Sequence, residues 1–286
     1  MQMGSWTFQI ISDGEFRLDG GAMFGIVPRV LWQKQNPADG DHRVALALNC
    51  LLAEGHGRRI LVDTGIGDRW DARQREMYGM DRRPGELLTT LRERGIAPDS
   101  ITDVILTHLH FDHAGGALLD YADRMEPAFP RATWWVQRQH WDWAHNPSER
   151  DRGSFRPEDF VALAGTGRLE LVDGSREILP EVRVWPAAGH TPGMQIVEFH
   201  TEGGVLAFVA DLIPFTANVH VPWVAAYDLN PLLSVAEKRQ FLSRAVEGDY
   251  LLVLQHDTVH QACRVSFADG RFRVREVLAL EEATPA

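Results

Sequence analysis

Short apolar runs dominate the hydrophobic pattern of this chain, and they are rich in Val, Ile, Leu and Phe. Short runs of this composition are typical of β-strands. The predicted strands lie within residues 6–14, 44–54, 58–65, 103–108, 132–137, 182–190, 195–201, 204–211 and 250–257.

Helical patterns are fewer. Residues 83–95 carry several leucines and end at a glycine, which favours a helix stop. Residues 156–167 begin with proline and acidic residues, which suit a helix N-terminus. Residues 234–248 begin with Ser234 and have Glu237 three positions later, which is the spacing of a capping box. We predict one helix in each of these three segments.

The order of elements indicates the fold class. Strands cluster towards both ends of the chain, with helices between and after them, which is more sheet than a doubly wound α/β fold would have. Residues 142–158 are polar and contain Pro, Ser and Gly, so we predict a loop there. Apolar residues make up 44% of the chain, enough for a large core, and 286 residues fit one α/β domain spanning 1–286.

Charge and composition argue against several classes of partner. The formal net charge of −11 disfavours a nucleic-acid partner and an anionic membrane surface. The N-terminus lacks the basic and apolar regions of a signal peptide, and no apolar run approaches the roughly 18 residues that span a bilayer. We therefore expect a cytoplasmic protein. Cys50 and Cys263 lie in or beside apolar runs, and we expect both to be buried free thiols.

The densest chemistry lies in "ILTHLHFDHAGG", residues 105–116, which holds His108, His110, Asp112 and His113 within six positions. A cluster of this kind seldom arises by chance. Neutral imidazole and carboxylate groups are ligands of divalent metals such as zinc. One ion needs three or four ligands, so this motif together with histidines elsewhere can support two ions.

Further candidate ligands follow other predicted strands. His190, Asp211 and His256 each come where an apolar run ends in a loop. Sites in sheets of this kind lie at the carboxyl ends of strands, so we expect all the candidates to converge on one edge. His260 competes with His256, but His256 directly follows the apolar run and precedes Asp257, so His256 is preferred.

The HxHxDH motif at 108–113, followed by a lone histidine in "GHTPG" (189–193), then Asp211 and His256, closely resembles the metallo-β-lactamase-fold hydrolases. The resemblance covers nearly the whole chain and includes "LVDTG" (61–65). Residues 19–32 and 210–231 look like the branch that holds quorum-quenching N-acyl-homoserine lactonases and methyl-parathion-hydrolase-like enzymes. The implied fold is a four-layer αβ/βα sandwich, with two sheets packed face to face and helices outside.

The resemblance also implies a ligand set for two divalent ions, zinc first, with iron, manganese or cobalt as alternatives. Asp63 would orient a ligand histidine, and Asp211 would bridge the ions together with a water or hydroxide. The implied first site consists of His108, His110 and His190, and the implied second site consists of Asp112, His113 and His256.

The implied reaction is hydrolysis of a small uncharged ester by the bridging hydroxide, and a lactonase that opens N-acyl homoserine lactones fits best. Asp112 would move a proton to the leaving oxygen. Several such lactonases place a Tyr three residues after the bridging Asp, where this chain has Pro214; Tyr227 is the predicted substitute. A phosphotriesterase and a thioesterase of glyoxalase II type are the alternatives. A β-lactamase is disfavoured because those enzymes usually carry an export signal.

Two rival classes are disfavoured as well. A flavo-diiron oxidoreductase would need a flavodoxin domain, for which the chain has no room, and a metal-free binding protein would not need an intact ligand set.

Two apolar segments could line a substrate pocket, and core packing is the alternative for each. The first is the loop with Met23 and Phe24. The second is the pair Trp134 and Trp135, of which strand alternation sends one ring inward. The oligomeric state stays open, with a homodimer as one expectation.

Overall fold

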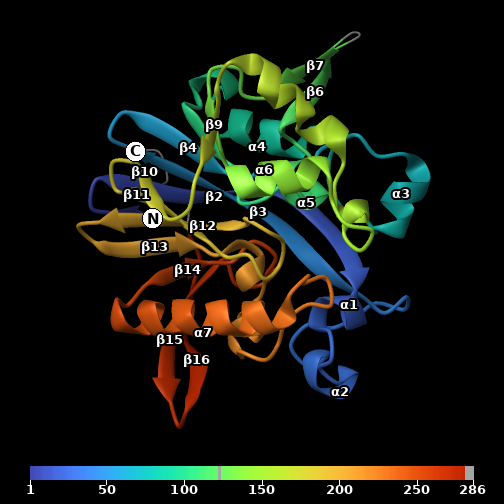
Figure 1. The fold of residues 1–286 in the computed structure, drawn as a ribbon, viewed down its shortest axis with the longest axis vertical. Coiled ribbons are helices and arrows are strands. Elements are labelled where there is room, and N and C mark those ends of the chain that lie inside the picture. Colours follow the sequence, from blue (N-terminus) through green and yellow to red (C-terminus); the bar gives the residue numbers. More distant parts are fainter. Residues whose placement is uncertain (122–123, 281–286) are drawn as a thin grey trace.

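Two sheets packed face to face form the centre of the computed structural model, which describes residues 1–121 and 124–280 (Figure 1). The order of the first seven-stranded sheet is β1 (Gln2–Met3), β2 (Trp6–Asp19), β3 (Arg43–Gly55), β4 (Arg58–Val62), β5 (Asp103–Ile105), β8 (Thr133–Gln137) and β9 (Leu169–Val172). The order of the second is β10 (Arg176–Leu179), β11 (Val182–Pro186), β12 (Gln195–Thr201), β13 (Gly204–Phe208), β14 (Leu251–Val253), β15 (Ala262–Ala268) and β16 (Arg271–Leu278). The strands β6 (Leu118–Tyr121) and β7 (Arg124–Pro127) form a separate hairpin.

Helices cover the outer faces of the two sheets, so the predicted four-layer sandwich is confirmed (Figure 1). The long helix α7 lies against the second sheet, and α4 lies against β2 of the first. The α-helices are α1 (Gly20–Phe24), α2 (Arg29–Trp32), α3 (Ala72–Met77), α4 (Glu86–Glu93), α5 (Phe111–Ala114), α6 (Arg138–His145) and α7 (Pro231–Glu247). Nowhere in residues 1–121 and 124–280 is a helix long and apolar enough to cross a bilayer.

Strand alternation explains how one sequence fills two cores. In β2, Trp6 and Phe8 point between the sheets, where their rings lie 5.3 and 5.1 Å from that of Phe199 on β12. Ile11, on the opposite face of β2, packs instead with Leu87 and other residues of α4. Because successive side chains of a strand point to opposite faces, a run that is apolar on both faces suits a sheet covered on both sides. Cys50 and Cys263 are buried free thiols, as predicted.

The predicted helix over 156–167 is wrong. Pro157–Asp159 and Val161–Thr166 are two short 3₁₀ segments, interrupted at Phe160. Phe160 is fully buried against the Trp141 ring of α6, and this packing outweighs the local helix signal. Helix α6 itself was missed, and its last residues occupy the start of the predicted loop at 142–158.

Helix α7 begins at Pro231, three residues earlier than predicted, and its capping residue is Asn230 rather than Ser234. The Asn230 side chain accepts a hydrogen bond from the Leu233 N–H, whereas Glu237 accepts from the N–H groups of Ala188 (2.8 Å) and Gly189 (2.9 Å). The serine–glutamate spacing therefore does not form a capping box. Instead, Glu237 fixes the loop that leads to His190.

Close packing explains the glycine beside that histidine. A Cβ atom at Gly189 would lie 2.3 Å from the backbone nitrogen of Ser234 in α7. Only glycine lets the loop and the helix come so near. Helix α7 thus holds the 187–190 loop through both backbone contact and the Glu237 carboxylate.

A buried ion pair supports the other side of the sandwich edge. Asp13 forms a salt bridge with Arg82 and also accepts hydrogen bonds from the N–H groups of Ile66 (2.9 Å), Gly67 (3.1 Å) and Leu87 (2.9 Å). Both charged side chains are almost completely buried, so each depends on the other for compensation. The carboxylate thereby fixes the segment at residues 66–67, which lies directly against the end of α5.

We expect Asp13→Ala to lower the free energy of unfolding by about 3–5 kcal/mol, because the buried Arg82 charge loses its main partner. The matched control is Asp68→Ala, since Asp68 also pairs with Arg82 but its side chain is 39% exposed. Asp68→Ala should lower the free energy of unfolding by about 1 kcal/mol or less. Urea unfolding followed by circular dichroism measures both, and equal losses would contradict the assigned role of Asp13.

Candidate metal centre

The two sheets contribute different halves of one cluster at the edge of the sandwich. Strand β5 of the first sheet leads into the 108–113 motif, whose last residues form the single-turn helix α5. The other three candidates come from the second sheet: His190 follows β11, Asp211 lies in a 3₁₀ turn after β13, and His256 follows β14. The structure brings all seven predicted ligands together, across two sheets rather than at the edge of one.

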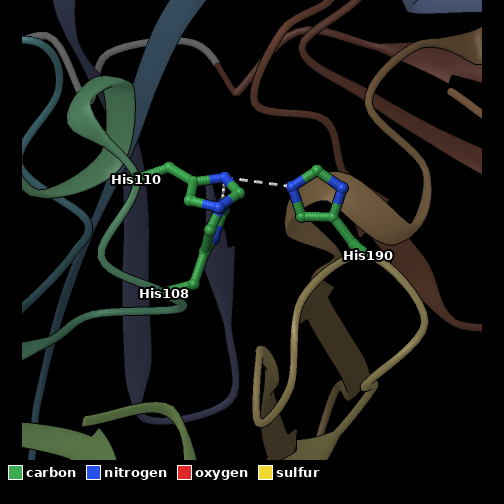
Figure 2. A group of neighbouring side chains, drawn as sticks. All are labelled: His108, His110 and His190. Carbon is green, nitrogen blue, oxygen red and sulfur yellow. Dashed lines mark hydrogen bonds between the residues drawn. The ribbon is translucent and has the colours of Figure 1, made fainter. Parts of the chain in front are cut away.

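Three imidazoles form the first group (Figure 2). His108 Nε2 lies 3.1 Å from His110 Nδ1, and His190 Nε2 lies 3.2 Å from the same atom. The rings come from opposite sides of the sandwich edge and point towards one another. Burial lowers the pKa of His108 and of His110 well below the ordinary histidine value, so both rings are neutral and offer lone pairs.

Asp112, His113 and His256 form the second group. The Nε2 atoms of His113 and His256 lie 3.7 and 3.6 Å from Asp112 Oδ2. All three side chains are buried. Their ligand atoms lie within 4.8 Å of one another, which is compact enough for a shared cation.

Asp211 faces both groups with different oxygens. Its Oδ2 lies 3.2 Å from His190 Nε2, whereas its Oδ1 lies 3.4 Å from His113 Nε2 and 3.1 Å from His256 Nε2. Burial would raise the pKa of Asp211, but the surrounding imidazoles, His113 first, hold that pKa well below the usual range. The carboxylate therefore stays anionic between the two groups.

Unpaired buried atoms indicate that these residues fit metal ions. His113 Nε2, His256 Nε2 and Asp211 Oδ1 are buried and have no hydrogen-bond partner among the described residues. Buried polar atoms of this kind are costly unless something binds them. Imidazole nitrogens and carboxylate oxygens are the donors that zinc and other borderline divalent ions take, so two such ions fit the donor set.

Hydrogen bonds fix the far nitrogens of the candidate ligands. Asp63, predicted to orient a histidine, accepts from His113 Nδ1 at 2.9 Å and from the N–H and hydroxyl of Thr107, both at 2.7 Å. His256 Nδ1 donates to the carbonyl of Ala47 at 2.9 Å. Partners of this kind select the tautomer and the ring orientation that a metal needs.

Asp228 is a functional candidate that the sequence did not reveal. Its Oδ1 lies 2.9 Å from His190 Nδ1, and both side chains are buried. The next two residues, Leu229 and Asn230, donate their N–H groups to the carbonyls of His190 and Gly189. The one local signal is the position of Asp228 just before the start of α7, which does not identify a partner 38 residues away.

His140 joins the two loops that carry the first group. Its Nε2 accepts from the Leu109 N–H at 2.7 Å, and its Nδ1 donates to the Pro192 carbonyl at 2.8 Å. Burial lowers the pKa of His140 to about 4, so the ring stays neutral. It takes no part in the three groups of candidate ligands.

A cavity of about 290 Å³ opens onto the cluster. The apolar side chains in its wall are those of Leu18, Met23, Leu46, Phe111, Pro214 and Ala225. Tyr78, Arg150, Ser154 and Tyr227 lie in the same wall, together with five of the candidate ligands: His110, Asp112, His190, Asp211 and His256.

Of the four predicted pocket residues only Met23 lines the cavity, and the predicted tyrosine, Tyr227, lines it as well. The pocket role of Phe24 is corrected, because Phe24 is fully buried, with its ring 5.3 Å from that of Trp32, and does not line the cavity. The pocket role of Trp134 and Trp135 is corrected. Trp134 is completely buried in the core, and the Trp135 indole donates to Asp103 Oδ1 at 3.0 Å, so neither ring lines the cavity.

Comparison with known proteins is consistent with this geometry. Residues 44–256 match the family model described as "Metallo-beta-lactamase superfamily". An N-acyl homoserine lactonase of Bacillus thuringiensis is 26% identical over 230 residues, which cover 76% of this chain and 84% of that protein. A probable metal-dependent hydrolase from Staphylococcus aureus is 27% identical and superposes over 100% of both chains with a TM-score of 0.89. The dizinc quorum-quenching lactonase AidC shares the fold at 22% identity, with 96% and 95% of the two chains covered and a TM-score of 0.79.

We expect elemental analysis of protein purified without chelator to find about two divalent ions per chain. His256→Ala should reduce this content to about one, because it removes a ligand of the second group. His260→Ala is the matched control, since His260 lies outside the ligand groups and its N–H donates to Asp257 Oδ1 at 2.9 Å. If only the His260 variant loses metal, the ligand is His260 and the assignment of His256 is wrong.

Asp228→Ala should weaken the affinity of the first group for metal about 10- to 100-fold, because His190 loses the partner that orients it. Asp228→Asn keeps an acceptor oxygen and should lose less metal affinity than Asp228→Ala. Competition with a coloured chelator measures both affinities. Unchanged metal affinity in Asp228→Ala would show that the hydrogen bond to His190 has no role in ligation.

Proposed function

The chain belongs to the metallo-beta-lactamase superfamily, and on that premise we propose that this hydrolase opens the ring of N-acyl homoserine lactones with the help of two divalent ions. The observation that carries the proposal is a cavity with both apolar and hydrogen-bonding side chains in its wall that ends on the candidate metal centre. The similarity to a lactonase over 76% of the chain supports the same substrate class.

Zinc is the preferred candidate for both ions, and iron, manganese and cobalt are the alternatives. One ion would be held by His108, His110 and His190. The other ion would be held by Asp112, His113 and His256, and Asp211 would contribute to both sites. When bound, such a pair supplies a Lewis acid and a hydroxide at neutral pH. The side chains of the cavity then have three tasks: to place the ester, to stabilise the negative charge that develops on its oxygen, and to move the proton.

Tyr227 is the proposed donor to the lactone carbonyl oxygen. The position three residues after Asp211, where several lactonases carry a tyrosine, holds Pro214, and both Pro214 and Tyr227 line the cavity. Burial raises the pKa of Tyr227 to about 12, so its hydroxyl stays protonated and can donate. A donor placed where charge develops stabilises the transition state more than the ground state.

Asp112 is the proposed proton carrier, and its carboxylate lines the same cavity. It would accept a proton as the nucleophile attacks and return it to the ring oxygen as that oxygen leaves. The apolar side chains of the wall would take the acyl chain. Each methylene buried there contributes at most about 0.8 kcal/mol, so chain length should have a modest effect.

The substrate class is tested by a comparison of kcat/KM values at neutral pH. The panel contains N-acyl homoserine lactones of increasing chain length, a paraoxon-like phosphotriester, a glutathione thioester and a β-lactam. We expect the lactones to be the best substrates, with kcat/KM rising from short to medium chains. If the phosphotriester or the thioester exceeds every lactone by about tenfold or more, the lactonase proposal fails and the hydrolase assignment remains.

Tyr227→Phe should lower kcat/KM for lactones by about 10- to 100-fold while the metal content stays at the wild-type value, because only the carbonyl donor is lost. Tyr121→Phe on β6 is the matched control, since Tyr121 is 64% exposed and does not line the cavity. Full activity in Tyr227→Phe would assign the donor role elsewhere, with Tyr78 as the other phenol in the wall.

A further inference from the structure

Arg150 is an exposed residue at the rim of the cavity that opens onto the candidate metal centre, and it lines that cavity. Its Nη2 donates to the Ala226 carbonyl at 2.6 Å, and it forms no ion pair with the carboxylates of residues 1–121 and 124–280. A guanidinium carries five N–H donors. Arg150 therefore has N–H donors to spare, in a wall that also contains the hydroxyl groups of Tyr78, Ser154 and Tyr227.

The backbone around Arg150 is held firmly. Its neighbour Asp151 is 5% exposed and accepts hydrogen bonds from the Trp143 indole at 2.7 Å and the Ser148 hydroxyl at 2.6 Å. The Arg152 N–H donates to the Ser148 carbonyl at 3.0 Å. An arginine on a loop fixed in this way can select a ligand, because little order has to be gained on binding.

Arg150 also joins separate segments of the cavity rim. The carbonyl that it binds belongs to Ala226, the residue before Tyr227, and the Ala226 N–H donates to the Ala22 carbonyl at 2.7 Å beside Met23. Arg150 therefore contacts the same short stretch of wall that presents the Tyr227 side chain. Arg150 and Tyr227 therefore line the same cavity from neighbouring points of its rim.

We propose that Arg150 is a specificity-determining residue that donates a hydrogen bond to the amide carbonyl of the acyl group. This inference rests on the proposed lactonase function. An N-acyl homoserine lactone carries an amide directly beside its ring, and the oxygen of that amide needs a donor once it leaves water. The apolar side chains Leu18, Met23 and Leu46 offer none, whereas Arg150 has guanidinium N–H groups that bind nothing else in the described chain. Arg150 thus separates acylamino lactones from plain alkyl lactones of the same length.

The test compares Arg150→Met with wild type on two substrates, N-hexanoyl homoserine lactone and an alkyl γ-lactone of similar length without an amide. We expect kcat/KM to fall about 10- to 100-fold for the first substrate and less than about twofold for the second. Arg152→Met is the matched control on the same loop, since the Arg152 side chain is 62% exposed and forms an ion pair with Glu149 at 3.7 Å; it should change neither value.

Three results would overturn the inference. Equal losses on both lactones would show that Arg150 only holds the rim. A selective loss in Ser154→Ala, with Arg150→Met unaffected, would assign the amide donor to Ser154. A larger effect of Arg150→Met on a lactone whose acyl chain ends in a carboxylate would make Arg150 an anion-binding residue.

A binding measurement separates this inference from the lactonase proposal. N-hexanoyl cyclopentylamine has the amide and a ring of the same size but no ester, and isothermal titration calorimetry measures its affinity. If wild type hydrolyses no lactone but binds this amide about tenfold more tightly than Arg150→Met, the lactonase proposal fails and the role of Arg150 stands. If wild type hydrolyses lactones and both proteins bind the amide equally, Arg150 has no such role.

Discussion

The constraint on which this structure depends is the convergence of buried lone pairs at the edge of the sandwich. Five imidazoles and two carboxylates meet there, and in each ligand group the candidate atoms lie within 4.8 Å of one another. Unpaired polar atoms are expensive in a protein interior, and several of these atoms have no hydrogen-bond partner within the described chain. Divalent cations would satisfy them all, which makes the metal centre part of the fold as well as of the chemistry.

Hydrogen bonds and core packing around the cluster hold those lone pairs in place. Asp63, Asp228 and the Ala47 carbonyl bind the far nitrogens of three candidate ligand histidines. Glu237 and His140 fix the loops on which the histidines lie. Ligand groups from two sheets can share ions only if the sheets keep a constant separation, and the aromatic core between them supplies that rigidity.

Local patterns predicted the parts of this architecture that local sequence determines. Strand runs, the 108–113 motif and the strand-end positions of His190, Asp211 and His256 need only a few neighbouring residues, and the resemblance to a known family supplied their assignment. Features set by distant contacts escaped prediction. Asp228 acts on His190 across 38 positions, and burial of Phe160 against α6 broke the helix expected over 156–167. The Trp134 ring is buried in the core. The sequence did not determine which of the two adjacent tryptophans would point inward.

The most direct test of the central claim is anomalous X-ray scattering from crystals of the protein, with data collected above and below the absorption edge of the metal found in it. Two peaks are expected, one among His108, His110 and His190 and one among Asp112, His113 and His256, with the Asp211 carboxylate between them. A single peak, or peaks away from these residues, would contradict a dinuclear centre built from the seven side chains.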